Sequence, residues 1–229
     1  MSDHGIDTHC DVYALHIRVT DFKKIVSEMM ESFRDLSWVN NLHPIDRKSY
    51  SSKAEQAIEL IVDGILEKIQ DEISIDIGEY LVSEVALRSL NEMYDHERLP
   101  AADLFKERRR GNGGFDFHTE SKTPNLMFGE AKFSKGSTKY TEALGQINDF
   151  IDDNKDTNEL SDLRHFVSDI LQTALEEEAL PAFPRRGYVA AFSINAKDPN
   201  TIMNNAIEHE HLKRLLNYPE VYLIGVEVE

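Results

Sequence analysis

Apolar residues in the N-terminal part of the chain follow first the spacing of a strand and then that of a helix. Residues 12–20 alternate enough to predict a strand, and residues 21–36 place apolar side chains three or four positions apart. Residues 40–48 contain an Asn-Asn pair, a proline and mixed charge, which are typical of a loop. We therefore expect an N-terminal β/α extension over residues 1–48 and a main domain over residues 49–229.

The main domain opens with patterns that predict two helices and a hairpin. Ser51 and Ser52 can cap a first helix, and a second helix is expected at about residues 77–93. Strand-like stretches at residues 115–120 and 126–133 flank the five residues Ser-Lys-Thr-Pro-Asn, which carry strong turn signals. These two strands are expected to form a β-hairpin.

The C-terminal half alternates between helical and strand patterns. Helices are expected at residues 140–152, 162–180 and 200–216, and strands at residues 188–194 and 221–228. From about residue 51 the predicted order is ααββααβαβ, which indicates a mixed α/β domain.

Length and composition fit a folded domain. A chain of 229 residues with 41% hydrophobic residues can bury a core, which excludes disorder over its whole length. Its apolar runs are far shorter than the roughly 20 residues of a membrane-spanning helix, and its acidic start lacks an apolar signal core. The single Cys10 excludes an internal disulfide and a cysteine-based zinc site. We therefore expect a cytoplasmic protein without membrane contact.

The charge of the chain disfavours unaided binding to nucleic acid. The formal net charge is −17, so phosphates are repelled at long range unless positive charge is concentrated locally. One such concentration lies at residues 106–110, where Arg108, Arg109 and Arg110 precede a glycine-rich run. These arginines are candidates for positioning a substrate phosphate. The alternative is a solubilising loop that offsets nearby acidic residues.

The predicted hairpin brings two carboxylates together. Pairing that is symmetric about Thr123 sets Glu120 opposite Leu126 and Asp116 opposite Glu130. Since side chains alternate along a strand, one face is expected to carry the charged residues Asp116, Glu130 and Lys132. The other face is expected to carry the apolar residues Phe115, Phe117, Met127 and Phe133.

Two carboxylates on opposed strand positions indicate a cation site. Their Cβ atoms lie roughly 4.5–5.5 Å apart, and the ionised groups repel each other unless a cation lies between them. Carboxylate oxygens, waters and a substrate phosphate are the ligands that Mg²⁺ prefers. Lys132 would then lie close enough to orient the attacking water or to offset charge that develops on the phosphate.

The residues around this pair resemble the PD-(D/E)xK nuclease superfamily. The resemblance rests on Gly-Phe-Asp116, the turn, and Phe-Gly-Glu130-Ala-Lys132-Phe, between a Glu-bearing helix and a second helix, and it covers roughly residues 77–195. It implies a restriction-endonuclease-like αβββαβ core, Mg²⁺ or Mn²⁺ held by Asp116 and Glu130, and Lys132 as the catalytic lysine. It also implies a further metal contact from Glu79 and a substrate contact from Gln146. Phe115 stands where the family has proline.

Within that superfamily the layout is similar to the HamA (AbpA-like) nuclease subunits of Hachiman anti-phage defence systems. The shared features are the N-terminal β/α extension and a helical insertion before the late core strand. This similarity implies a deoxyribonuclease controlled by a helicase partner (HamB-like), with the extension as the expected partner contact. DNA affinity supplied by that partner would reconcile a nuclease with the charge of −17.

Three other interpretations stay open. The charged face can be an ordinary Lys–Glu pair on a solvated sheet. The domain can be a catalytically silent, nuclease-like regulatory or binding subunit of a helicase complex. A metal-dependent phosphoesterase with a small substrate is a third reading, which requires a closed apolar pocket that an exposed hairpin does not provide.

Overall fold

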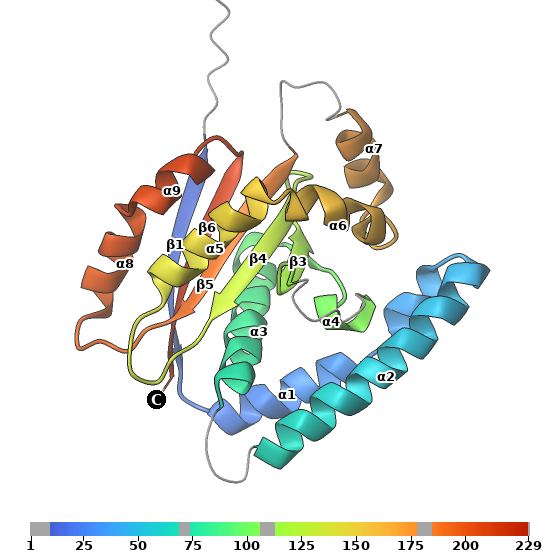
Figure 1. Cartoon of the computed structure of the whole chain (residues 1–229), viewed down its shortest axis with the longest axis horizontal. Helices are drawn as coiled ribbons and strands as arrows, with labels where there is room; N and C mark the ends of the chain where they lie inside the picture. The colour runs from blue at the N-terminus through green and yellow to red at the C-terminus, as the bar shows by residue number, and fades with distance from the viewer. Residues whose placement is uncertain (1–9, 69–73, 106–112, 178–184, 229) are drawn as a thin grey trace, which may run out of the picture.

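The computed structural model describes residues 10–68, 74–105, 113–177 and 185–228. They form a mixed α/β fold around one six-stranded sheet with the strand order β1-β6-β5-β4-β3-β2 (Figure 1). The strands are β1 (Asp11–Val19), β2 (Glu97–Arg98), β3 (Phe117–Glu120), β4 (Leu126–Lys132), β5 (Arg186–Ser193) and β6 (Glu220–Val228). Strands β1, β6, β5 and β4 are parallel, whereas β3 and β2 continue the sheet antiparallel.

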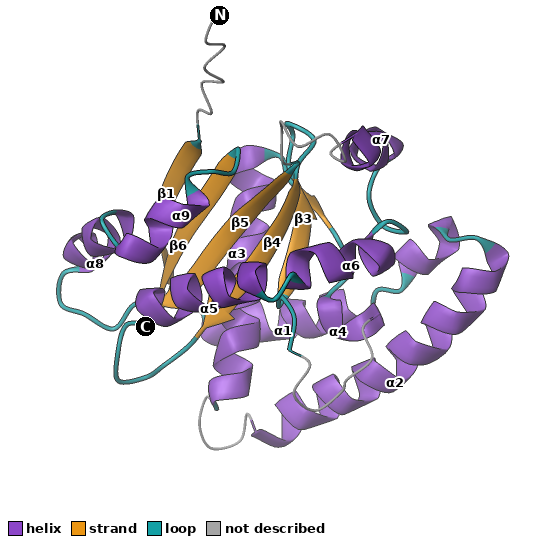
Figure 2. Cartoon of the chain, turned by 45° about the horizontal axis from the view of Figure 1, so that its top comes forward, coloured by secondary structure: helices purple, strands orange, loops and turns teal. Residues whose placement is uncertain are grey.

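Helices cover both faces of the sheet. They are α1 (Phe22–Arg34), α2 (Pro44–Lys68), α3 (Ile75–Tyr94), α4 (Ala102–Phe105), α5 (Tyr140–Asp152), α6 (Lys155–Leu163), α7 (Asp169–Glu177), α8 (Pro199–Ile207) and α9 (Glu210–Leu215), with a 3-10 turn η1 (Ser37–Asn41). Helix α5 with α8 and α9 lies on one face, and α3 lies on the other (Figure 2). Within the described residues no helix is both long and apolar enough to cross a membrane.

Three apolar clusters hold these layers together. Beneath α5, one cluster includes Phe128 and Tyr188, and beneath α3 a second includes Met127 and Val189. Neighbouring residues of β4 and β5 therefore point into opposite cores, as strand alternation requires. A third, smaller cluster joins α1, α2, α3 and α4 beside the sheet. It fixes the N-terminal helices against the start of α3.

Most strands and the first helices agree with the sequence pattern. The predicted strands near residues 12–20, 188–194 and 221–228 are β1, β5 and β6, and the helix at residues 140–152 is α5. Helix α1 begins after Asp21, whose carboxylate accepts the Lys24 amide and so caps the helix. The pattern missed β2, α4 and most of α6, which are short or polar.

The loop predicted at residues 40–48 is confirmed only at residues 42 and 43. Helix α2 begins at Pro44 and continues through Ser51 and Ser52, which therefore cap nothing. Proline is favoured in the first turn of a helix, because its fixed φ fits there and its missing N–H has no helical partner. The boundary between residues 1–48 and 49–229 thus falls inside a helix. Strand β1 of the extension lies in the main sheet, paired with β6.

Two long helices predicted near the C-terminus are each interrupted. The pattern at residues 162–180 covers the end of α6 and all of α7, which begins after Ser168; residues 178–180 lie outside the described residues. The Ser168 hydroxyl accepts the Leu171 amide, and its own amide donates to Glu120, so a new helix begins there. The pattern at residues 200–216 divides at His209, which caps α9.

Gly78 sets how closely α3 approaches β4. A Cβ atom at this position would lie 2.0–2.6 Å from ring atoms of Phe133, the residue directly after β4. Non-bonded carbon atoms do not approach so closely. Any side chain here would therefore push the start of α3 away from the end of β4.

We expect Gly78→Ala to lower the free energy of unfolding by about 1–3 kcal/mol, because overpacking outweighs the gain in helix propensity. For a chain of this size the melting temperature should fall by about 2–12 °C in a thermal denaturation experiment. Gly136→Ala is the matched control, since a Cβ there meets nothing within 4 Å. Equal melting temperatures for the two variants would contradict the proposed contact.

Candidate active site

The hairpin register places the predicted carboxylates at the open end of β3 and β4. Glu120 pairs with Leu126 and Phe117 with Gly129, as the symmetric register predicts. Directly before β3, the Asp116 amide donates to the Gly129 carbonyl at 2.9 Å. Asp116 therefore lies beside Gly129 and Glu130, where the two strands separate.

The Asp116 carboxylate takes over a position in the hydrogen-bond ladder of β4. Its Oδ2 accepts the Ala131 amide at 2.8 Å. That amide lies two residues beyond Gly129 and faces the same neighbouring strand, because alternate residues of a strand bond to the same side. β3 begins only at Phe117, so no backbone carbonyl of this strand lies opposite the Ala131 amide. The hydrogen bond thus fixes Asp116 in the plane of the sheet.

The face predicted for Phe115 is wrong. Phe117 packs in the core beneath α3, but Phe115 lies in the core beneath α5, with its ring 5.0 Å from that of Phe128. Strict alternation does not extend to Phe115 because β3 begins only at Phe117. The Phe115 amide instead donates to the carboxylate of Glu159, a residue of α6.

Glu130 is the most deeply buried acidic side chain of the site. It is 1% exposed, and its Oε1 accepts the Lys132 ammonium at 2.6 Å. The other oxygen, Oε2, is buried and has no hydrogen-bond partner among the described residues. Burial, followed by repulsion from Asp116, raises the pKa of Glu130 well above its ordinary value. A positive charge at this position would remove both penalties.

Lys132 is held as a cation by the carboxylates around it. Burial by itself lowers its pKa, but Glu130, Asp116 and Glu79 raise the pKa above its ordinary value. The ammonium group lies 2.6 Å from Glu130 and 3.7 Å from Glu79. In this arrangement Lys132 is suited to stabilising negative charge and to orienting a water molecule, and not to removing a proton.

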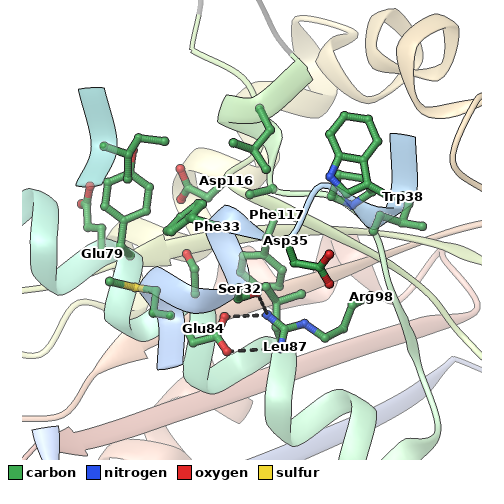
Figure 3. Close-up of a pocket in the computed structure, with 18 of the residues that line it drawn as sticks. Ser32, Phe33, Asp35, Trp38, Glu79, Glu84, Leu87, Arg98, Asp116 and Phe117 are labelled. Atoms are coloured by element: carbon green, nitrogen blue, oxygen red, sulfur yellow. Dashed lines mark hydrogen bonds and ion pairs between the residues drawn. The ribbon is translucent and has the colours of Figure 1, made fainter. Parts of the chain in front are cut away.

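Helix α3 brings the predicted Glu79 to the same place. Ser74 caps this helix by accepting the Ile77 amide, and Glu79 follows in its second turn. Its carboxylate is about one-third exposed and lies 3.7 Å from the Lys132 ammonium. Figure 3 shows Glu79 and Asp116 bordering the same cavity. The structure therefore brings together Asp116, Glu130, Lys132 and Glu79.

The donors at this site fit a hard divalent cation. Asp116 and Glu130 provide carboxylate oxygens, including the buried Oε2 without a partner. Within the described ranges no three His, Cys, Asp or Glu side chains are arranged to hold an ion by themselves. Mg²⁺ commonly binds through one or two carboxylates, with waters and substrate phosphate completing its shell. The residues present thus fit Mg²⁺ or Mn²⁺ and do not fit a softer metal.

Two further predictions receive no support from the geometry. Gln146 lies half-buried in α5, and no hydrogen bond connects it to Asp116, Glu130 or Lys132 among the described residues. The arginines at positions 108, 109 and 110 lie outside the described residues. Their proposed substrate contacts stay predictions.

A cavity of about 670 Å³ adjoins the carboxylates, and the sequence pattern did not predict it. It extends from Glu79 and Asp116 to Trp38, and its walls come from α1, η1, α2, α3 and the segment around β2 and α4 (Figure 3). The hairpin is not exposed as expected, since every residue of β3 is buried. No sequence signal identifies such a cavity, because its wall combines segments that are far apart in the chain.

Comparisons of this chain with models of protein families, with curated proteins and with solved structures found no match in any of the three.

We expect Mg²⁺ to stabilise the protein through Glu130. At a concentration about ten times its Kd, Mg²⁺ should raise the melting temperature by about 3–6 °C. Glu130→Gln keeps the shape of the side chain but removes its charge. In EDTA it should melt at or above the wild-type temperature, and Mg²⁺ should no longer stabilise it.

The matched control is Glu220→Gln, which alters a buried carboxylate at the start of β6. This variant should retain the wild-type response to Mg²⁺, whatever its melting temperature in EDTA. Equal Mg²⁺ responses in the wild type and in Glu130→Gln would exclude Glu130 as a ligand.

Proposed function

We propose that this protein is a Mg²⁺-dependent nuclease that hydrolyses DNA phosphodiester bonds. The observation that carries the proposal is the buried Glu130 carboxylate, whose Oε2 has no partner among the described residues. It interacts electrostatically with Asp116, and its other oxygen accepts a hydrogen bond from the Lys132 ammonium. A Lys–Glu pair on a solvated sheet face does not explain this carboxylate. Its side chain is 1% exposed, and only one of its two oxygens has a hydrogen-bond partner among the described residues.

Each residue of the site has a role that follows from its position. Asp116 and Glu130 would hold the cation, with Glu79 near enough to Lys132 to influence its position. When bound, Mg²⁺ or Mn²⁺ supplies Lewis acidity for the phosphate and lowers the pKa of a water molecule. Lys132 orients the attacking water and offsets the negative charge that develops on the phosphate.

The order of elements around the site supports the same family. Along the chain α3, β2, β3, β4, α5 and β5 follow one another, with α4 inserted before β3 and with α6 and α7 before β5. Strands β2, β3 and β4 form an antiparallel meander, and α5 connects β4 to the parallel β5. This order supports the proposal, because the resemblance implies an αβββαβ core with a helical insertion before its late strand.

The acidic character of the chain favours a partner that delivers DNA. A net charge of −17 opposes unaided binding to phosphates. Following the resemblance, we propose a helicase subunit as that partner and anti-phage defence as the process. A catalytically silent subunit of such a complex is the alternative, and loss of cleavage on mutation of Lys132 separates the two.

The cavity beside the carboxylates favours one second candidate. A phosphoesterase with a small substrate needs an enclosed pocket, and about 670 Å³ is within the usual range for small-molecule sites. Hydrolysis of small phosphodiesters in Mg²⁺, with no cleavage of DNA under any condition, would identify this activity.

The central test is Lys132→Ala. We expect this variant to lose about 10²–10⁴-fold in the rate of Mg²⁺-dependent cleavage, because a charge that acts on the developing transition state is lost. Linear and circular DNA would be incubated with the protein, alone and with the helicase subunit, at low and physiological salt. Its Mg²⁺-dependent thermal stabilisation should persist, since Asp116 and Glu130 remain.

The matched control is Lys122→Ala, which removes an exposed lysine in the turn of the hairpin. It should cleave at the wild-type rate. Cleavage by Lys132→Ala at that same rate would remove Lys132 from the mechanism. Absence of cleavage by the wild type in every condition, with the complex assembled, would favour the silent subunit.

A further inference from the structure

The cavity beside Asp116 and Glu79 has a wall unlike that of a phosphate site. Its aromatic lining consists of Phe33, Trp38, Tyr80 and Phe117. Phe33 and Tyr80 pack edge to face, with ring centroids 5.5 Å apart. Such rings provide flat apolar surfaces on which a planar group can stack.

Trp38 contributes its indole ring to this wall. Its ring is fixed by edge-on contacts with Tyr50 and Phe166, at centroid distances of 6.4 and 5.3 Å. Its Nε1 atom is buried and has no partner among the described residues. The contacts with Tyr50 and Phe166 therefore hold the indole as a fixed aromatic surface at this end of the cavity.

The charges of the cavity exclude a phosphate from its interior. Arg98 lines it, but its guanidinium is paired with Glu84, with contacts of 2.6 and 3.2 Å (Figure 3). The remaining charged groups of the lining are the carboxylates Asp35, Glu79 and Asp116. A neutral, planar, polar group fits this combination better than an anion does.

We propose that this cavity binds a nucleobase, with the attached phosphate held outside it at Asp116 and Glu130. This inference rests on the proposed function, because it specifies how the nucleic acid would be held. Asp116 and Glu79 belong both to the cavity wall and to the carboxylate site, so a base inside the cavity places its own backbone next to Asp116. A base can enter only when it is unstacked.

The consequence is a preference for single-stranded or frayed DNA over intact duplex. The base has two possible sources, which are the strand being cut and a free nucleotide. Both share the same recognition by ring stacking, and the experiment below distinguishes them.

Trp38 is the single tryptophan of the chain, so its fluorescence reports directly on the cavity. Emission would be measured for Lys132→Ala in Mg²⁺, which prevents cleavage during the titration. The probes are a single-stranded oligonucleotide of about eight nucleotides, the same oligonucleotide with abasic residues, deoxyadenosine monophosphate and deoxyribose 5-phosphate. Base stacking against the cavity wall should quench or shift the emission.

We expect saturable quenching by the base-bearing oligonucleotide and at least about tenfold weaker binding of its abasic counterpart. If the mononucleotide binds as tightly as the oligonucleotide, the ligand is a free nucleotide; tighter binding of the oligonucleotide identifies the substrate strand. Equal binding of the base-bearing and abasic oligonucleotides would overturn the proposal.

A matched pair of variants on α1 tests whether the base that quenches Trp38 emission lies in the cavity. Ser32 and Ser27 are both exposed, but only Ser32 lines the cavity. Ser32→Phe should weaken base-dependent quenching at least about tenfold by filling the cavity, whereas Ser27→Phe should not change it. Equal quenching in these two variants would refute the location.

Cleavage assays separate this inference from the proposed function. If the wild-type protein cuts DNA and an abasic residue at every position leaves the rate unchanged, the nuclease stands and the base site fails. If base-dependent quenching occurs but no condition gives cleavage, the base site stands and the nuclease fails.

Discussion

The hydrogen bond between the Asp116 carboxylate and the Ala131 amide is the contact on which the site depends. It replaces a backbone ladder bond just before the start of β3, where β4 continues without that partner strand. On this side Asp116 sets a second carboxylate near Glu130, while β5 pairs with Glu130 on the other side. The result is a buried acidic group for which the described residues provide a hydrogen-bond partner on only one oxygen. Such atoms are uncommon in folded proteins, and a bound ion or water is among the explanations for them.

The surrounding layers determine how rigid this arrangement is. Beneath Glu130 and its neighbours, the cores under α5 and α3 fix β4 from both faces, and α3 is brought close by Gly78 against Phe133. Glu79 can therefore reach Lys132 only because the helix carries no side chain at position 78. Gly129 allows a similarly close approach between β4 and β3. A Cβ atom there would lie 2.2 Å from the Phe117 ring and displace the start of β3.

The charges at the carboxylate site and in the cavity favour different kinds of ligand. Around Lys132 three carboxylates share one ammonium, so added positive charge is favoured there. In the cavity, Arg98 is paired with Glu84 and four aromatic residues contribute to the wall, so a neutral planar group is favoured. The two regions adjoin at Asp116 and Glu79. A nucleotide has these same two parts, a charged phosphate and a neutral base, at a fixed separation.

Local pattern by itself determined the hairpin, its register and the group Asp116, Glu130 and Lys132, because strand alternation and turn chemistry act over a few neighbouring residues. It also predicted β1, α1, α5, β5 and β6. The start of α2, the divisions at Ser168 and His209, and the face of Phe115 followed from capping and from partners such as Glu159 and Glu120. The pairing of β1 with β6 and the cavity between Trp38 and Asp116 depend on tertiary packing. Such contacts join residues far apart in the chain, and their free energy comes from burying the whole core together, which no short segment encodes.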